Sequence, residues 1–361
     1  MLYFLYPFKD VSIFFNLFRY ITFRSAGASI TAFLFCIFIG PHIIEWLKRL
    51  NATAHQQREH AQAIHAFYAG KKNVPTMGGI LIVASVLTSM LLWGNFTNRF
   101  VWILILVMTG FAGVGFLDDW IKLKSKSSKG LSSKTKFYGQ LIIGLALGCF
   151  LYFDPSFDLR IYIPFLKQET VSIGLLFIPF VVLVLVGSSN ALNLTDGLDG
   201  LAVGCTLFCI GAFSIVTYIV GHAEFAHYLA ISHIPEAGEV TVFCSALVGA
   251  SAGFLWFNSY PAEVIMGDTG SLALGGALGA VAVLIKKELM LMIVGGVFVW
   301  EALSVIIQVT SFKLTKKRVF LMSPFHHHLQ LKGWPESKVT IRLWIIALIL
   351  AVAGLSTLKV R

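Results

Sequence analysis

Long apolar runs separated by short polar segments are the main pattern along this chain. A helix needs about 20 apolar residues to cross the hydrocarbon core of a bilayer, and runs of that length recur throughout the sequence. The pattern predicts an all-α fold in which residues 1–361 form a single polytopic membrane domain with about ten transmembrane helices. The expected spans are 26–48, 77–94, 99–117, 137–153, 171–189, 200–221, 240–257, 271–286, 289–312 and 341–357.

The first 24 residues are apolar and aromatic, but they do not read as a cleavable signal peptide. Lys9, Asp10 and Arg19 interrupt the apolar stretch, and no small-residue cleavage site follows it. We interpret residues 1–24 as an interfacial lead-in. The composition agrees with a membrane protein, because 57% hydrophobic and only 13% charged residues are too apolar for an ordinary soluble domain.

Lys and Arg gather in alternate loops between the expected spans. Such a bias marks the cytoplasmic side, so the sequence predicts cytoplasmic basic loops and, with ten spans, both termini outside. The net charge of +10 therefore reflects membrane topology, and we expect lipid rather than nucleic acid as the partner. The expected cytoplasmic loops lie near 49–76, 118–136, 190–199, 258–270 and 313–340.

Two adjacent carboxylates, Asp118 and Asp119, end the third expected span. Neighbouring helical residues point about 100° apart, so one acid can bind a metal while the other accepts a proton. Their mutual repulsion favours a bound cation such as Mg²⁺ or a general base. A solvated helix end without a chemical role is the alternative.

More acids lie in Asn- and Gly-rich segments of the expected cytoplasmic loops. If residues 190–200 are helical, Asn193, Asp196 and Asp199 share a face, whereas an Asn/Asp-rich turn is the alternative. Asp268 lies at the entrance of the eighth expected span, where helix amides favour anions. A helix cap without further function is the alternative for Asp268.

Three consecutive histidines, His326, His327 and His328, follow a basic run in the last cytoplasmic loop. Successive side chains diverge and cannot all bind one zinc ion, so phosphate contacts or an oriented imidazole are expected, with a surface cluster as the alternative. Glu301 and Gln308 share one face of the ninth span. An acid within the membrane is a functional candidate, although Glu301 could equally serve helix packing.

Basic and hydroxyl groups accompany these acids. Lys71 and Thr76 lie at the mouth of the second span, and Lys122, Lys126 and Lys134 follow the Asp pair. Phosphate is the natural ligand for such an array. The cytoplasmic loops therefore predict a site for Mg²⁺ and a phosphate-rich substrate.

In order and membrane side, four of these motifs resemble the polyprenyl-phosphate sugar-1-phosphate transferase superfamily. They are the Asp118-Asp119 pair, residues 193–200, residues 266–268 and the triple histidine. The histidine loop and residues 331–336 resemble, more narrowly, the phospho-N-acetylmuramoyl-pentapeptide transferases, and the match extends from about 75 to 339. Ile265 and Gln330 depart from that family's pattern, which usually has Phe and Glu there.

The resemblance implies a Mg²⁺-dependent phosphoglycosyl transferase of the bacterial cytoplasmic (inner) membrane, with its active site on the cytoplasmic face. The implied reaction transfers phospho-N-acetylmuramoyl-pentapeptide from UDP-MurNAc-pentapeptide to undecaprenyl phosphate. It yields lipid I and UMP, in the first membrane step of peptidoglycan synthesis. A homodimer is also implied.

The resemblance further implies roles for individual residues. Asp268 is implied to bind Mg²⁺, Asp118 to be the base for the lipid phosphate and a second metal ligand, and Asp119 to support the site. His326 is implied to act beside them. The residues implied to line the nucleotide and phosphate pocket are Lys71, Thr76, Asn193, Asp196, Asp199, Asn258, Gln308, His327 and His328.

Two other functions remain open, as does the order of chemical steps. A sibling enzyme that transfers N-acetylglucosamine-1-phosphate would use the same acids, although the triple histidine argues against it. An ion-coupled transporter would also have many spans, but transporters place substrate groups near mid-membrane, whereas these acids cluster at one face. One-step attack and a two-step route through an aspartyl-phosphate both fit these residues.

Overall fold

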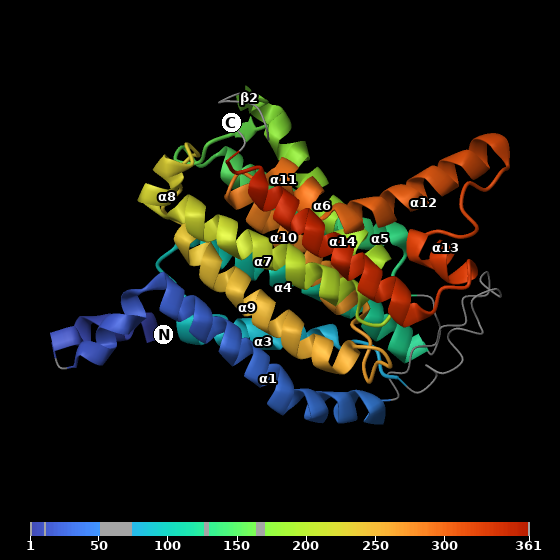
Figure 1. Cartoon of the computed structure of the whole chain (residues 1–361), viewed down its shortest axis with the longest axis horizontal. Coiled ribbons are helices and arrows are strands. Elements are labelled where there is room, and N and C mark those ends of the chain that lie inside the picture. Colours follow the sequence, from blue (N-terminus) through green and yellow to red (C-terminus); the bar gives the residue numbers. More distant parts are fainter. Residues whose placement is uncertain (1, 11, 51–73, 126–129, 164–169, 360–361) are drawn as a thin grey trace.

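The computed structural model describes residues 2–10, 12–50, 74–125, 130–163 and 170–359. Within these residues nine helices are long and apolar enough to cross a membrane, and they form an elongated bundle (Figure 1). The prediction of an all-α polytopic membrane protein is thereby confirmed. The nine helices are α1 (Ile21–Arg49), α4 (Arg99–Ser125), α5 (Ser133–Tyr152), α6 (Phe177–Thr195), α7 (Leu201–Gly221), α9 (Ala237–Asn258), α10 (Gly267–Leu284), α12 (Gly296–Thr315) and α14 (Glu336–Ser356).

Shorter elements connect or extend these helices. The two strands pair antiparallel, with Ile161 opposite Val171, and form the only sheet within the described residues. The shorter elements are η1 (Leu2–Asp10), η2 (Ile13–Arg19), α3 (Gly79–Trp93), β1 (Arg160–Tyr162), β2 (Thr170–Ser172), η5 (Gly174–Leu176), α8 (Ala223–Tyr228), α11 (Glu288–Val294) and α13 (Phe325–Leu331).

Two expected spans differ from the observed helices. The span expected at 77–94 is α3, which has only 15 residues, because the chain before it is extended and pairs with residues 265–266. Ile265 N donates to Pro75 O at 2.8 Å, and Gly79 N donates to Met266 O at 2.8 Å. The span expected at 289–312 is not continuous, because α11 ends before Gly295 and α12 begins after it.

Helix α10 is the centre of the bundle. It is the most buried of the nine long helices and packs mainly against α4 and α6. Its sequence is rich in Gly and Ala, so the neighbouring helices can approach closely. The first turn of α10 is therefore held between the ends of α4 and α6.

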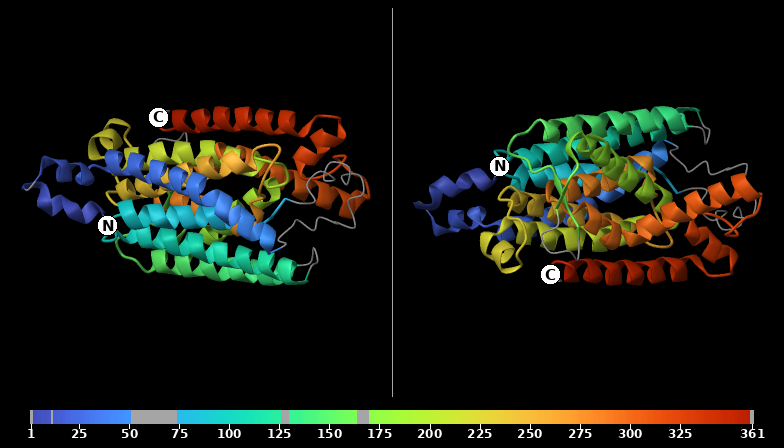
Figure 2. Two further views of the ribbon diagram at one scale, coloured as in Figure 1. Left: turned by 90° about the horizontal axis from the view of Figure 1, so that it is seen from below. Right: turned by 90° about the horizontal axis from the view of Figure 1, so that it is seen from above.

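The bundle has two distinct ends (Figure 2). Both termini lie at one end, and α13, the end of α4 and the start of α5 lie at the other. Termini on one side require an even number of crossings, which the nine long helices reach when the shorter apolar helix α3 is counted with them. At the end with the termini, α1 and α9 are joined by a buried ion pair in which Arg24 donates to both oxygens of Glu239 at 2.5 and 2.7 Å. The helices η1 and η2 of the lead-in project beyond α1 at the same end (Figure 1).

Candidate active site

Three carboxylates from two neighbouring helices converge at the end of the bundle opposite the termini. One oxygen from each of Asp118, Asp119 and Asp268 lies within 4.8 Å of the other two, and only this group of acids, histidines or cysteines in the described part of the chain has such geometry. Asp118 and Asp119 lie in the part of α4 that packs against α10. The predicted convergence of these acids is confirmed, and the cluster can hold a metal ion.

Asp268 is surrounded by hydrogen-bond donors from three helices. Its Oδ2 accepts from Lys136 Nζ at 2.7 Å and from Lys122 Nζ at 3.0 Å. Its Oδ1 accepts from Asn193 Nδ2 at 2.7 Å. Two ammonium groups and one amide therefore hold this carboxylate in the centre of the cluster, where a phosphate group would find matching donors.

Asp119 fixes the start of α10. It accepts hydrogen bonds from Thr269 N at 2.9 Å and Thr269 Oγ1 at 2.8 Å, and a longer one from Asp268 N at 3.3 Å. A carboxylate at these amides caps the helix and opposes its positive end. Gly267 adopts a φ of 74°, which glycine tolerates best, and this conformation brings Asp268 against the cap.

Asp118 organises the chain that leads into α5. Its Oδ1 accepts from Leu131 N at 2.8 Å, and its other oxygen pairs with Lys122. Ser132 then caps α5 by accepting from Thr135 N at 3.1 Å. This path directs Lys136, one turn into the helix, toward Asp268.

Lys136 is a site residue that the sequence predictions omitted in favour of Lys134. Lys134 is exposed and forms no ion pair within the described residues. A helical period over α5 would have identified Lys136, because it lies on the same stripe as the buried Gln140, Gly144 and Leu147. The predicted phosphate ligands Lys71 and Lys126 lie outside the described residues.

The Asn- and Asp-rich segment after α6 is a turn and not a continuous helix. Helix α6 ends at Thr195, so Asn193, Asp196 and Asp199 do not share a face. Asn193 reaches Asp268, whereas Asp199 accepts from Ala262 N at 3.0 Å. Burial, together with the negative charges of Asp268, Asp119 and Asp199, raises the pKa of Asp196 to about 8.

Asn258 and Gln308 use their amide groups to hold loops in place. Asn258 accepts from Gly200 N at 3.1 Å and donates to Val264 O at 2.8 Å, which joins the turns after α6 and α9. Gln308 accepts from the amides of Val319 and Phe320 and donates to Phe320 O at 2.9 Å. Their contact with substrate stays a prediction.

The three histidines have different partners, which agrees with the expected divergence of their side chains. His326 is buried, with Nδ1 3.2 Å from Glu301 Oε2. His327 Nδ1 lies 2.9 Å from Gln330 Oε1, and His328 Nδ1 accepts from Leu321 N at 3.1 Å. The sequence left open whether Glu301 has a functional role or serves helix packing. In the structure its carboxylate lies beside His326.

Thr76 also lies at the cluster. Its hydroxyl oxygen is 3.0 Å from the position that a Cβ atom on Gly267 would occupy. The extended pairing of residues 75–79 with 265–266 holds it there. Thr76, at the mouth of the second expected span, is therefore adjacent to the carboxylates.

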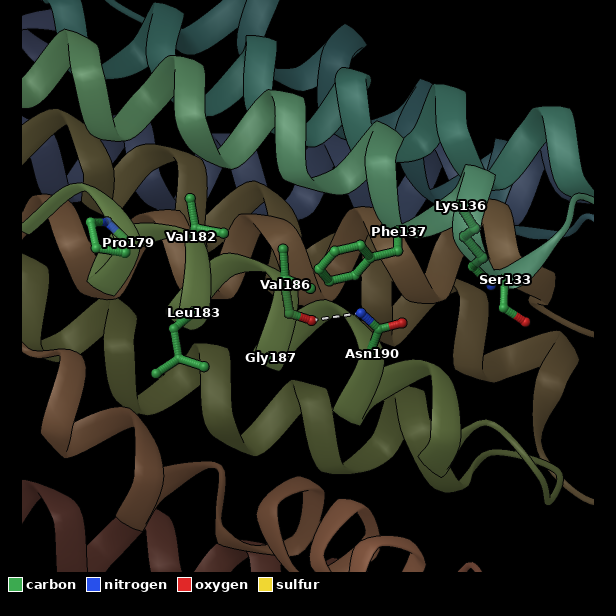
Figure 3. A pocket seen from close by; sticks show the side chains of 9 residues that line it. All are labelled: Ser133, Lys136, Phe137, Pro179, Val182, Leu183, Val186, Gly187 and Asn190. Atoms are coloured by element: carbon green, nitrogen blue, oxygen red, sulfur yellow. Dashed lines mark hydrogen bonds between the residues drawn. The ribbon is translucent and has the colours of Figure 1, made fainter. Parts of the chain in front are cut away.

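An apolar pocket of about 660 Å³ between α5 and α6 leads to this site (Figure 3). Figure 3 shows Lys136, Ser133 and Asn190 at one end, while the walls beyond them are mainly apolar. Asn190 donates to Val186 O at 2.8 Å and to Gln140 Oε1 at 2.7 Å. The lining residues are Ser133, Lys136, Phe137, Pro179, Val182, Leu183, Val186, Gly187 and Asn190.

Comparison with known proteins agrees with this geometry. Residues 101–286, which include all three clustered carboxylates, match glycosyl transferase family 4. The phospho-N-acetylmuramoyl-pentapeptide-transferase of Oleidesulfovibrio alaskensis is 51% identical over 363 residues, covering 100% of both chains. The enzymes of the same name from Thermodesulfovibrio yellowstonii and Geobacter sp. are 50% and 48% identical and cover 99% of both chains. The resemblance drawn from the motifs is confirmed: this chain belongs to the phospho-N-acetylmuramoyl-pentapeptide transferase family.

Proposed function

We propose that this chain makes lipid I by transferring phospho-N-acetylmuramoyl-pentapeptide from UDP-MurNAc-pentapeptide to undecaprenyl phosphate, with release of UMP. The reaction would take place at the cytoplasmic face of a bacterial inner membrane. The observation that carries the proposal is the cluster of Asp118, Asp119 and Asp268 beside Lys122 and Lys136, at one end of a membrane bundle. Full-length identity of about half to enzymes of that name supports it.

The donor atoms of the cluster fit Mg²⁺. Carboxylate oxygens are the hard ligands that this ion prefers, and here they lie within 4.8 Å of one another. Asp268 and Asp118 are the residues that would hold the ion, and Asp119 would support the site by capping α10. When bound, Mg²⁺ would neutralise the pyrophosphate of the donor and stabilise the departing UMP.

The side chains around the cluster suit the meeting of two polyanions. An oxygen of the lipid phosphate would bond to the β-phosphorus of the donor, while the bond from that phosphorus to the bridging oxygen breaks and its electron pair leaves with UMP. Asp118 would accept any proton that the lipid phosphate retains. Lys122 and Lys136, which contact Asp268 at 3.0 and 2.7 Å, would screen the phosphates as they approach.

The pocket between α5 and α6 is suited to the lipid acceptor. Its polar end carries Lys136 and Asn190, which can bind a phosphate, and its walls of Pro179, Val182 and Leu183 can hold a polyprenyl chain (Figure 3). The same lysine contacts Asp268, so a phosphate in this position would be next to the carboxylates.

The proposal is tested by UMP release from the purified protein in detergent with undecaprenyl phosphate. We expect release with UDP-MurNAc-pentapeptide, dependence on Mg²⁺, and a loss of at least about 100-fold in kcat for Asp268→Asn. Asp158→Asn, at the opposite end of the bundle, is the matched control and should retain activity.

Other outcomes would redirect or end the proposal. Release from UDP-N-acetylglucosamine alone would identify the sibling transferase, and no release from either donor would refute the proposed activity. Appreciable residual turnover of Asp118→Asn would argue against an aspartyl-phosphate on Asp118.

A further inference from the structure

Glu301 is a fully buried acid in α12 whose side chain faces one histidine. Glu301 and His326 both have 0% of their side chains exposed, and Glu301 Oε2 lies 3.2 Å from His326 Nδ1. The backbone amide of His326 donates to the same oxygen at 3.4 Å. Within the described residues, neither Glu301 Oε1 nor either ring nitrogen of His326 forms a hydrogen bond, so the 3.2 Å approach of Nδ1 to Oε2 is the closest side-chain contact that joins these buried polar groups.

The opposite edge of the imidazole rests against Gly197. A Cβ atom on Gly197 would lie 2.8 Å from Cε1 of His326 and closer still to Nε2. The φ of Gly197 is not in the left-handed region, in contrast to that of Gly200 at 70°. The local backbone conformation therefore does not require glycine at position 197, but the imidazole does, because any side chain would displace it.

These contacts connect α12 to the carboxylate cluster. Gly197 directly follows Asp196, whose carboxyl group is close enough to Asp268 and Asp119 to feel their charge. His326 lies between Glu301 on one side and the turn of Asp196 and Gly197 on the other. The imidazole of His326 thus contacts Glu301 of α12 with one edge and the turn beside the carboxylate cluster with the other.

We infer that Glu301 is a positioning residue that holds the proton of His326 on Nδ1 and directs Nε2 toward the Asp196–Gly197 turn. A carboxylate beside one ring nitrogen selects the tautomer and the ring orientation of a histidine, as is common for histidines that support functional sites. Glu301 itself acts only through His326. The inference rests on the proposed function for its effect on turnover, but not for the state of the imidazole.

A double-mutant cycle tests whether Glu301 acts through His326. Glu301→Met keeps the volume but removes the acceptor, and we expect kcat/KM for UMP release to fall about 10- to 100-fold. In a His326→Ala background the same substitution should change kcat/KM by less than about 3-fold. Full additivity of the two losses would overturn the inference.

The buried ion pair of Arg24 and Glu239 provides the matched control for a merely structural role. Glu239→Met breaks the pair with Arg24 at the far end of the bundle. It should lower the Tm while leaving kcat/KM near the wild-type value. If Glu301→Met lowers the Tm as much as Glu239→Met does and leaves kcat/KM unchanged, Glu301 serves packing alone.

The tautomer of His326 is measured directly by ¹⁵N NMR of histidine-labelled protein, with the His326→Ala spectrum for assignment. We expect a proton on Nδ1 in the wild type and its loss from Nδ1 in Glu301→Met. A wild-type His326 with its only proton on Nε2 would refute the inference. Because this measurement needs no substrate, it stands even if the protein releases no UMP.

A pair of glycine substitutions tests the other edge of the ring. Gly197→Ala should displace the imidazole and lower kcat/KM about 10-fold or more, as Glu301→Met does. Gly211→Ala is the control, because a Cβ atom there would meet nothing within 4 Å. Unchanged activity of Gly197→Ala would show that the position of the imidazole does not matter for turnover.

Discussion

Lys134 and Lys136 are two residues apart and of the same type, yet only Lys136 contacts the carboxylate cluster. Lys136 Nζ lies 2.7 Å from Asp268 Oδ2, whereas Lys134 is exposed. A partly buried charge close to a phosphate site contributes far more than a solvated one, because water screens the latter. We expect Lys136→Met to lower kcat at least about 100-fold and Lys134→Met to change it less than about 3-fold, measured by UMP release.

Lys134 and Lys136 lie in the same helix and carry the same charge. Lys134→Met therefore controls for the loss of one positive charge from α5. Equal losses for the two variants would contradict a specific role for Lys136. A Tm of Lys136→Met that stays close to that of the wild type would separate loss of chemistry from loss of folding.

At the scale of elements, the α5–α6 pocket is expected to hold the lipid acceptor. Leu183 lines this pocket with 67% of its surface exposed, and the larger Trp at this position would narrow it. We expect Leu183→Trp to raise the KM for undecaprenyl phosphate about 10-fold and to leave the KM for the nucleotide donor unchanged, since the proposal assigns this pocket to the acceptor alone.

Leu106 of α4 supplies the matched control for this substitution. It is a lipid-facing leucine with 65% of its surface exposed and lies outside the pocket. Leu106→Trp should leave both KM values within about 2-fold of the wild type. An acceptor KM that is insensitive to Leu183→Trp would place the polyprenyl chain elsewhere.

At the scale of the whole molecule, the bundle places the carboxylates and the termini at opposite ends, which the positive-inside rule assigns to the cytoplasm and the exterior. Lys317→Cys and Ser156→Cys would introduce exposed thiols at these two ends, since the five native cysteines are buried or half-buried. In intact spheroplasts an impermeant maleimide should label Ser156→Cys at once, and Lys317→Cys only after permeabilisation. The reverse pattern would place the active site outside.

The number and approximate position of the helices could be predicted from the sequence because each depends mainly on its own residues. A run of about 20 apolar residues is helical in a bilayer whatever its neighbours are, since unpaired backbone groups cannot be left in lipid. The acids also had to share one end of the bundle, because Asp118, Asp119 and Asp268 lie at the ends of spans that face the same side. Local sequence therefore determined the architecture, the side of the site and its carboxylates.

Contacts between distant segments decided the remainder. Lys136 meets Asp268 only because α5 packs beside α4 and α6, and α3 is short because residues 75–79 pair with a loop nearly 200 positions later. The amides of Asn258 and Gln308, which the sequence predicted to line the substrate pocket, also satisfy backbone groups of neighbouring loops. Glu301 and His326 are 25 residues apart, and only the return of α13 against α12 makes them a pair. Contacts between side chains that are far apart in the sequence depend on how the helices pack, and a local sequence pattern carries no information about that packing. Tertiary structure alone therefore decides which polar side chains contact the carboxylate cluster and which hold the surrounding loops.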